Sequence, residues 1–145
     1  MRVVVIGCGR IGAHVARRLA GDGHAVCVID QDRASLGRLG EGFSGETVVG
    51  PGFDREVLQS ARVAEADAVV VLTNVDATNF MVAKAVTGLF GVQRVTVRVN
   101  DPEFQPIFDE LGLRTIPVPD LVLDRVRDAL AAGGPREGDA DRRPR

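Results

Sequence analysis

The residues with the clearest chemical signature form one short segment that fits the pattern G-x-G-x-x-G without a substitution: Gly7, Cys8, Gly9, Arg10, Ile11 and Gly12. Gly7 permits a tight turn, Gly9 lets the backbone approach a pyrophosphate, and Gly12 lets a helix pack close to a strand. Free N–H groups and the positive end of the helix dipole then face a bound anion. The segment therefore predicts a turn that binds the phosphates of a nucleotide.

One acidic residue follows the glycine turn at the distance expected for a ribose-binding acid. Asp30 comes eighteen residues after Gly12 and ends the apolar segment 25–29. Its carboxylate is thereby placed to accept hydrogen bonds from both hydroxyls of an adenosine ribose. The same charge disfavours the 2′-phosphate of NADP, and Arg33 offsets this only slightly. Asp30 and the adjacent Gln31 are therefore predicted to belong to the nucleotide site.

Two variable positions of the turn each have two interpretations. Arg10 is either a cation that meets extra negative charge, such as the terminal phosphate of ADP or ATP, or a solvated arginine at a helix start. Cys8 either fills its position or senses redox state, if helix N–H groups lower its thiol pKa. Cys27, the other cysteine, is predicted to be a small apolar core residue, and the two form no metal-binding or C-x-x-C pattern.

The turn is flanked by the elements that must hold it. Residues 3–6 are a continuous apolar run, typical of a strand buried on both faces of a parallel sheet. Ile11, Val15 and Leu19 then recur at helical spacing, and residues 25–29 predict a second strand. Strand, glycine turn, helix, strand and terminal acid follow in the order of a dinucleotide-binding unit.

Strand and helix patterns alternate through the rest of the chain. Further strands are predicted at 47–49, 68–72, 95–99 and, on an edge because Pro117 cannot donate to a ladder, 115–118. Helices are predicted at 31–39, 54–62 with Asp54 as cap, 77–90, 100–111 with a start or distortion at Pro106, and 121–132. The pattern indicates one domain, 1–132, with a Rossmann-like doubly wound parallel α/β sheet of order 3-2-1-4-5-6. Residues 133–145 are predicted to be a disordered polar tail.

In such a sheet the strand order reverses between strands one and four, and the ligand crevice lies there. Residues that leave strand four, namely Thr73, Asn74 and Asp76, are therefore predicted to face the glycine turn. Asp76 caps the next helix, contacts the ligand, or does both. Arg98 ends strand five on the ligand side, where it contacts the ligand or pairs with Asp101.

Composition excludes several classes of protein. A net charge of −2 with scattered basic residues gives no indication of a nucleic-acid partner. No apolar run approaches the roughly eighteen residues of a membrane span. The N-terminus has the pattern of a core strand rather than of a signal peptide. We therefore expect a cytoplasmic protein.

Residues for catalysis are scarce. His14 and His24 lie on the first predicted helix and in the loop after it, without triad partners at a recognisable spacing, and the chain has no tyrosine. No second domain that would bring a substrate to a nicotinamide is predicted. The pattern favours a nucleotide sensor over an enzyme. An NAD-dependent oxidoreductase, or its detached cofactor-binding domain, is one alternative, and a dimerising scaffold that binds no nucleotide is another.

Four motifs in a fixed order carry a family resemblance: G-C-G-R-I-G with Asp30, Val57-Leu58 after a glycine-containing turn, T-N-V-D-A-T-N at 73–79, and E-L-G-L-R-T-I-P-V-P-D at 110–120. Over about residues 1–125 the chain resembles the N-terminal nucleotide-binding domain of the TrkA and KtrA potassium-uptake regulators, called the RCK domain. That resemblance implies binding of NAD(H) or ADP/ATP by the glycine turn, Asp30 and the residues after strand four, with Arg10 on a distal phosphate.

The resemblance also implies partners. Such domains pair through their later helices into dimers or larger rings and dock on a membrane potassium channel or transporter subunit, so the protein would lie at the inner face of the membrane. The helix from Leu121 resembles the one that crosses to the partner. Asp120 stands where the family often has a glutamate that helps a divalent cation bridge subunits.

Two departures from the family pattern are visible. Where members read G-D-A-T-D after strand three, this chain has Gly50-Pro51-Gly52-Phe53-Asp54, so the contacts to the adenine edge are not carried over. The family's C-terminal ligand-binding domain has no counterpart here, which implies either a separate RCK C-terminal-domain protein or function without it.

Overall fold

The computed structural model describes residues 1–133, so the prediction of a disordered tail falls, from residue 134 on, outside the described residues. Six strands form one sheet: β1 (Arg2–Ile6), β2 (Ala25–Asp30), β3 (Glu46–Val49), β4 (Ala68–Val71), β5 (Val95–Val99) and β6 (Arg114–Pro117). The helices are α1 (Arg10–Gly21), α2 (Arg33–Leu36), α3 (Arg55–Ser60), α4 (Asp76–Phe90), α5 (Gln105–Glu110) and α6 (Val118–Ala131). Three short 3-10 segments, Gly37–Leu39, Val63–Glu65 and Pro102–Phe104, complete them.

All strand pairs are parallel, and their order is β3-β2-β1-β4-β5-β6, which confirms the predicted fold class and topology. The register pairs Ile6 with Ile29 on one side and with Val71 on the other, so β1, β2 and β4 end at the same edge of the sheet. Because β1 is central, its residues Val4 and Val5 are completely buried, each on one face of the sheet.

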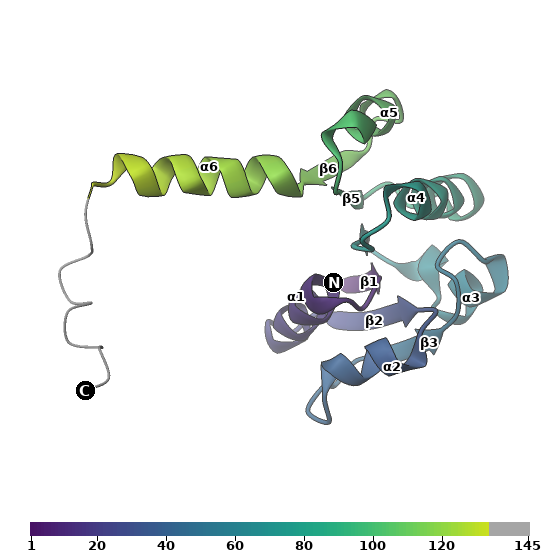
Figure 1. Ribbon diagram of the computed structural model, residues 1–145. Coiled ribbons are helices and arrows are strands. Elements are labelled where there is room, and N and C mark those ends of the chain that lie inside the picture. The colour runs from purple at the N-terminus through teal and green to yellow at the C-terminus, as the bar shows by residue number, and fades with distance from the viewer. Residues whose placement is uncertain (134–145) are drawn as a thin grey trace, which may run out of the picture.

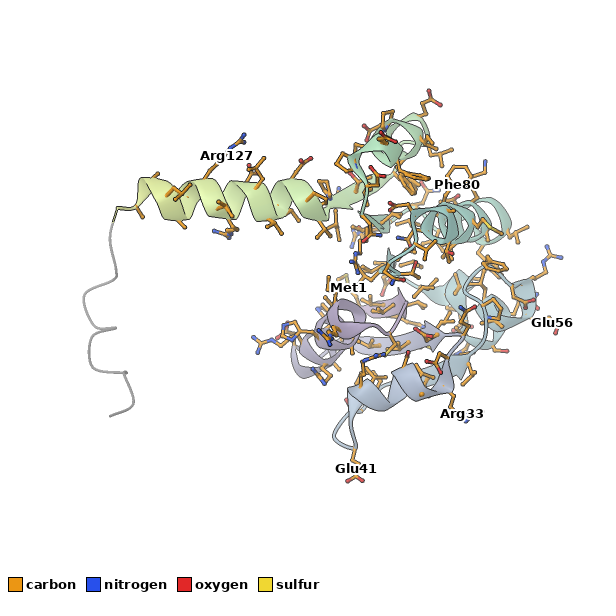
Figure 2. The ribbon with its side chains drawn as sticks, in the orientation of Figure 1. Met1, Arg33, Glu41, Glu56, Phe80 and Arg127 are labelled. Atoms are coloured by element: carbon orange, nitrogen blue, oxygen red, sulfur yellow. The ribbon has the colours of Figure 1, made fainter. Side chains whose placement is uncertain are left out.

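Helices cover both faces of the sheet (Figure 1). One apolar layer joins the strands to Leu58 of α3, Val82 and Val86 of α4, and Phe108 of α5. The other layer joins them to α1, through side chains that include Ala16. Figure 2 shows Phe80 between α4 and α5, where its ring meets that of Phe108 edge to face with 6.2 Å between centroids.

Several predicted helix boundaries shift for local reasons. The helix predicted from residue 31 begins at Arg33, because the carboxylate of Asp32 accepts the N–H of Ala34 and caps it. Asp54 caps α3 as predicted, accepting the N–H of Val57 at 3.1 Å. The segment after residue 100 divides into a 3-10 turn and α5, with proline in the first positions of α5. The last helix begins at Val118 rather than at 121, also with proline near its start.

The last helix lies apart from the others. Figure 1 shows α6 extending away from the sheet, and none of its residues is buried. In Figure 2 the side chain of Arg127 extends from α6 into open space. Within residues 1–133, no helix has the length and apolar character needed to cross a bilayer.

Candidate nucleotide site

A cavity of about 630 Å³ opens where β1, β2 and β4 end at the carboxyl edge of the sheet. On one face of the sheet the cavity reaches the start of α1 and α2. On the other face it reaches the start of α4 and the loop before α3. Its walls include these residues: Ile6, Gly7, Gly9, Arg10, Ile11, Ile29, Asp30, Gln31, Asp32, Ser35, Arg38, Gly52, Phe53, Leu72, Thr73, Asn74, Val75, Thr78, Val82 and Arg98.

The glycines shape the phosphate end of the cavity. Gly7 has φ +102°, and a Cβ there would lie 2.9 Å from the backbone N of Thr73, so the turn passes against the strand-four loop. A Cβ on Gly12 would overlap the carbonyl of Gly7, whereas one on Gly9 would meet no atom within 4 Å. Gly9 is the N-cap of α1, and no side chain caps the helix there. The first-turn N–H groups of α1 are thereby left for an anion.

Asp30 connects the turn to the cavity. One oxygen of its carboxylate accepts the N–H of Cys8 at 2.7 Å, and the other accepts the N–H of Asp32 at 2.8 Å. Each carboxylate oxygen has a further lone pair, so the group retains acceptor capacity for two hydroxyls while it fixes the turn. This is the geometry that a ribose diol requires.

Three guanidinium groups line the cavity: those of Arg10, Arg38 and Arg98. Arg38 also donates to the carbonyl of Cys8 at 3.3 Å, which holds it beside the turn. The Nε of Arg98 is buried without a hydrogen-bond partner, and none of the ion pairs within residues 1–133 joins Arg98 to Asp101. Against the carboxylates of Asp30 and Asp32, three cations favour a ligand with more than one negative charge.

The loop after β4 is fixed by a buried amide. Asn79, completely buried on α4, accepts the hydroxyl of Thr73 and donates to the carbonyls of Thr73 and Arg98, both at 3.0 Å. Thr73 and Asn74 line the cavity as predicted. The amide therefore ties the ends of β4 and β5 together beneath the crevice.

Asp76 corrects the prediction that it faces the glycine turn. Its carboxylate is 7% exposed and accepts the N–H groups of Asn100 and Asp101, each at 2.8 Å, so it does not line the cavity. The N-cap position belongs to Val75, and Asp76 is the first helical residue. Asp76 consequently anchors the loop after β5 and is not the N-cap of α4, while its contact with a ligand stays a prediction.

Cys8 and Gly12 also lie outside the cavity walls. The Cys8 side chain is buried in the apolar layer below α1, and burial, followed by the charge of Asp30, raises the pKa of its thiol. This corrects the alternative in which helix N–H groups lower that pKa. Burial likewise raises the pKa of Cys27, with a smaller contribution from Glu46. Neither cysteine has the accessible thiolate of a redox sensor.

A metal centre finds no support in the described part of the chain. Residues 1–133 contain no group of three or more His, Cys, Asp or Glu side chains that could hold a metal ion. Asp120 is exposed in the first turn of α6. Its role in holding a divalent cation stays a prediction.

The cavity includes walls that the sequence patterns did not reveal. Asp32, Ser35 and Arg38 reach it from α2 and the turn after it, and Gly52 and Phe53 reach it from the loop after β3. A signal for them was present, because loops at the carboxyl ends of β2 and β3 belong to the crevice of such a sheet. Which side chains of these loops face inward depends on the turns themselves.

Comparison with known proteins finds relatives that are named as potassium-uptake proteins. The family model of the TrkA-N domain matches residues 3–119. The Trk system potassium uptake protein TrkA of Streptomyces coelicolor is 36% identical over 134 residues, which are 92% of this chain and 60% of that protein. A TrkA homolog of Pyrococcus abyssi is 33% identical over 111 residues, covering 77% of this chain and 49% of that protein. The chain thus spans about half to three fifths of the length of these relatives.

Solved structures share the fold. The Shewanella denitrificans Kef CTD in its AMP-bound form superposes with a TM-score of 0.78 at 17% identity, covering 98% of this chain and 87% of that one. The GsuK channel bound to NAD has a TM-score of 0.68 at 22% identity, with 81% of this chain and 21% of that chain covered. GsuK bound to ADP has a TM-score of 0.67 at 23% identity, with 80% and 31% covered.

Proposed function

This chain belongs to the TrkA-N domain family, and from that premise and the geometry of the cavity we propose that it binds NAD(H) or ADP/ATP and regulates a potassium channel or transporter. The observation that carries the proposal is the glycine turn with Asp30 beside it. The turn leaves the start of α1 uncapped by any side chain, and the Asp30 carboxylate retains acceptor capacity at the place of a ribose.

The charges around the cavity support a nucleotide with two or more phosphates. Arg10 is exposed at the first position of α1, and Arg98 is a further basic residue of the cavity walls. Asp30 and Asp32 both stand at the ribose end, where they disfavour the 2′-phosphate of NADP. The structural neighbours bound to NAD and to ADP are consistent with this class of ligand.

Regulation is favoured over oxidoreduction. Neither His14 nor His24 lies among the cavity walls, and His24 instead meets the amino group of Met1 at 3.4 Å. The proposal is therefore a sensor whose ligands differ in their affinity for alternative assemblies, because a ligand shifts an equilibrium only by that difference. Its working location would be the cytoplasm, at the inner membrane face, through a channel or transporter subunit.

The last helix supports assembly with a second copy. Val122, Val126 and Leu130 recur every fourth residue on α6, with 57%, 48% and 78% of their surfaces exposed. An apolar stripe on a helix that projects from the fold is a surface that an association covers. We include in the proposal a homodimer or larger ring formed through α6, with residues 1–132 as the nucleotide-binding unit and a separate RCK C-terminal-domain protein as a further partner.

Thermal unfolding with a nucleotide panel tests the proposal. The ligands are NAD, NADH, NADP, AMP, ADP and ATP, with and without magnesium, and the variants are Asp30→Ala and a matched control, Asp22→Ala. Asp22 is an exposed acid at the opposite end of α1. A ligand that binds only the folded state stabilises it by roughly 2.7 kcal/mol at a hundredfold excess over Kd.

We expect ADP, ATP or NAD to raise the melting temperature of the original chain and of Asp22→Ala but not of Asp30→Ala. Each shift is taken against the same variant without ligand, since Asp30 also holds the turn through Cys8. A chain that no nucleotide stabilises is a scaffold rather than a sensor. Turnover of NADH with a small carbonyl compound would instead establish the oxidoreductase alternative.

A further inference from the structure

The cavity has an apolar end on the face that carries α3 and α4. Its floor is made by Ile6, Ile29 and Val82, which belong to one apolar layer. Gly52 lies directly on this floor, because a Cβ there would overlap the Cγ2 of Ile6 and come within 3.3 Å of the Cγ2 of Val82. The phosphate end, with Gly9 at the start of α1, lies on the opposite face of the sheet.

Phe53 follows Gly52 and is presented to this end of the cavity. Its side chain lines the cavity and is 39% exposed, although it is a large apolar group. The loop that carries it is held at both ends: the N–H of Gly50 donates to the carbonyl of Asp30 at 3.0 Å, and the N–H of Asp54 donates to the carbonyl of Pro51 at 3.1 Å. The loop is therefore fixed at both ends, and it places a partly exposed aromatic side chain in the cavity wall.

The loops that follow β3 and β4 stand on opposite sides of the ends of β2 and β1, because the sheet order is β3-β2-β1-β4. Val75 and Thr78, at the start of α4, line the same cavity as Phe53. A flat group that extends from a ribose at Asp30 would thus lie between Phe53 on one side and the start of α4 on the other.

On the basis of the proposed function, we propose that Phe53 is the stacking wall of a nucleobase slot and that the slot selects bases by ring area rather than by hydrogen bonds to their edges. An aromatic side chain stacks on any base, because every base has a π face. Discrimination between bases normally comes from paired donors and acceptors on side chains.

The amides of Gln31 and Asn74 line the cavity next to Asp30 and to Thr73, which lies against the glycine turn, whereas the side chains of the floor, of Phe53 and of the start of α4 offer no such pair. Apart from the hydroxyl of Thr78, they are the hydrocarbon groups of Ile6, Ile29, Phe53, Val75 and Val82. Pro51, at the place of the aspartate in the family pattern, has neither an N–H nor a polar side-chain group. The slot therefore binds adenine, guanine and hypoxanthine with similar affinity, and it binds the pyrimidines more weakly because their smaller rings stack over less area.

Titration calorimetry with ADP, GDP, IDP, CDP and UDP tests the inference. The variants are Phe53→Ala, Phe53→Leu, which keeps apolar bulk without a ring, and Phe90→Ala as matched control. Phe90 is a partly buried phenylalanine that lines a separate cavity beside Met1 and Arg94, away from the nucleotide site. The unliganded melting temperature of each variant is measured first, and titrations are made well below it.

In the original chain we expect the three purine diphosphates to bind within about threefold of one another, and the pyrimidine diphosphates more weakly. Phe53→Ala and Phe53→Leu lose about tenfold or more for each purine, because stacking on an aromatic ring is removed. Phe90→Ala keeps the original affinities.

Two results would overturn the inference while leaving the proposed function intact: ADP binding about a hundredfold more tightly than GDP, or both Phe53 variants binding ADP as the original chain does. If no diphosphate binds the original chain, the proposed function fails as well. The nucleotide panel with Asp30→Ala distinguishes these cases, because it does not depend on Phe53.

Discussion

Replacing Asp76 by alanine should destabilise the fold without removing a contact to the nucleotide. In the structure the carboxylate accepts two backbone N–H groups, from Asn100 and Asp101, each at 2.8 Å, and the side-chain amide of Asn100 at 3.3 Å. Hydrogen bonds to a charged group contribute about 1.5–3 kcal/mol each, and a buried donor left unpaired costs a similar amount. Because the pocket around Asp76 admits little water, at 7% exposure, two lost backbone bonds amount to about 3 kcal/mol or more.

Urea unfolding followed by circular dichroism measures this loss, since the chain has no tryptophan to report by fluorescence. We expect the free energy of unfolding to fall by about 3 kcal/mol with an unchanged m-value. Asp76→Asn should lie between the original chain and Asp76→Ala, because its amide oxygen still accepts one N–H while its NH₂ faces the other donor. Asp124→Ala, at an exposed acid of α6, should stay within about 0.5 kcal/mol.

Two outcomes would refute this account of Asp76. A loss below about 1 kcal/mol would mean that the two N–H groups find other partners at no cost. Unchanged stability with abolished ADP binding would restore the interpretation of Asp76 as a ligand contact, which the sequence alone left open.

Three further predictions follow from the same structure. Gly12→Ala should lower the melting temperature and abolish nucleotide stabilisation, because its Cβ overlaps the carbonyl of Gly7; an unaltered melting curve would contradict this. Burial raises the thiol pKa of Cys8 and of Cys27 in the folded state. The two protonated thiols therefore contribute fully to stability below the unfolded-state pKa of about 8.5, and this contribution is lost as the pH rises above that value. A Cys8→Ala, Cys27→Ala chain should show a weaker fall in unfolding free energy between pH 8 and 10, measured in urea. Val126→Asp should convert a dimer to a monomer in sedimentation without lowering the melting temperature of the monomer, because α6 is exposed at that residue.

The centre of the sheet was predictable because its strands β1 and β4 are short, continuous apolar runs. Residues 3–6 are buried and residues 68–72 are buried except for the half-buried Val70, and both form continuous hydrophobic segments. The glycine turn between the first strand and helix indicated a parallel unit. Order 3-2-1-4-5-6 followed from alternation of strands with helices. The roles of the glycines were predictable as well, because Gly7 has a positive φ and a Cβ at Gly12 would overlap the carbonyl of Gly7.

The cavity walls from α2 and from the loop after β3 were not predictable in the same way. Arg38 belongs to a helical pattern in the sequence, but Asp32 caps a helix of one turn, and the 3-10 segment after it holds Arg38 beside Cys8. Phe53 faces the cavity because its loop is tied at Gly50 and Asp54. The placement of Arg38 and that of Phe53 both depend on local hydrogen bonds, which cannot be deduced from the residue types alone.

Polar residues after a central strand show why position along the chain does not determine role. Thr73 and Asn74 extend from β4 into the crevice, as the topology predicts. Two residues later the chain has entered α4, and the helix turns Asp76 toward the loop after β5, where two N–H groups have no partner of their own. Asp76 is thereby 7% exposed and lies outside the cavity walls, whereas Asp30, which also accepts two backbone N–H groups, lines the cavity. Whether an acid near a nucleotide crevice faces the crevice thus depends on where the backbone donors that it pairs with lie, and not on its position in the sequence alone.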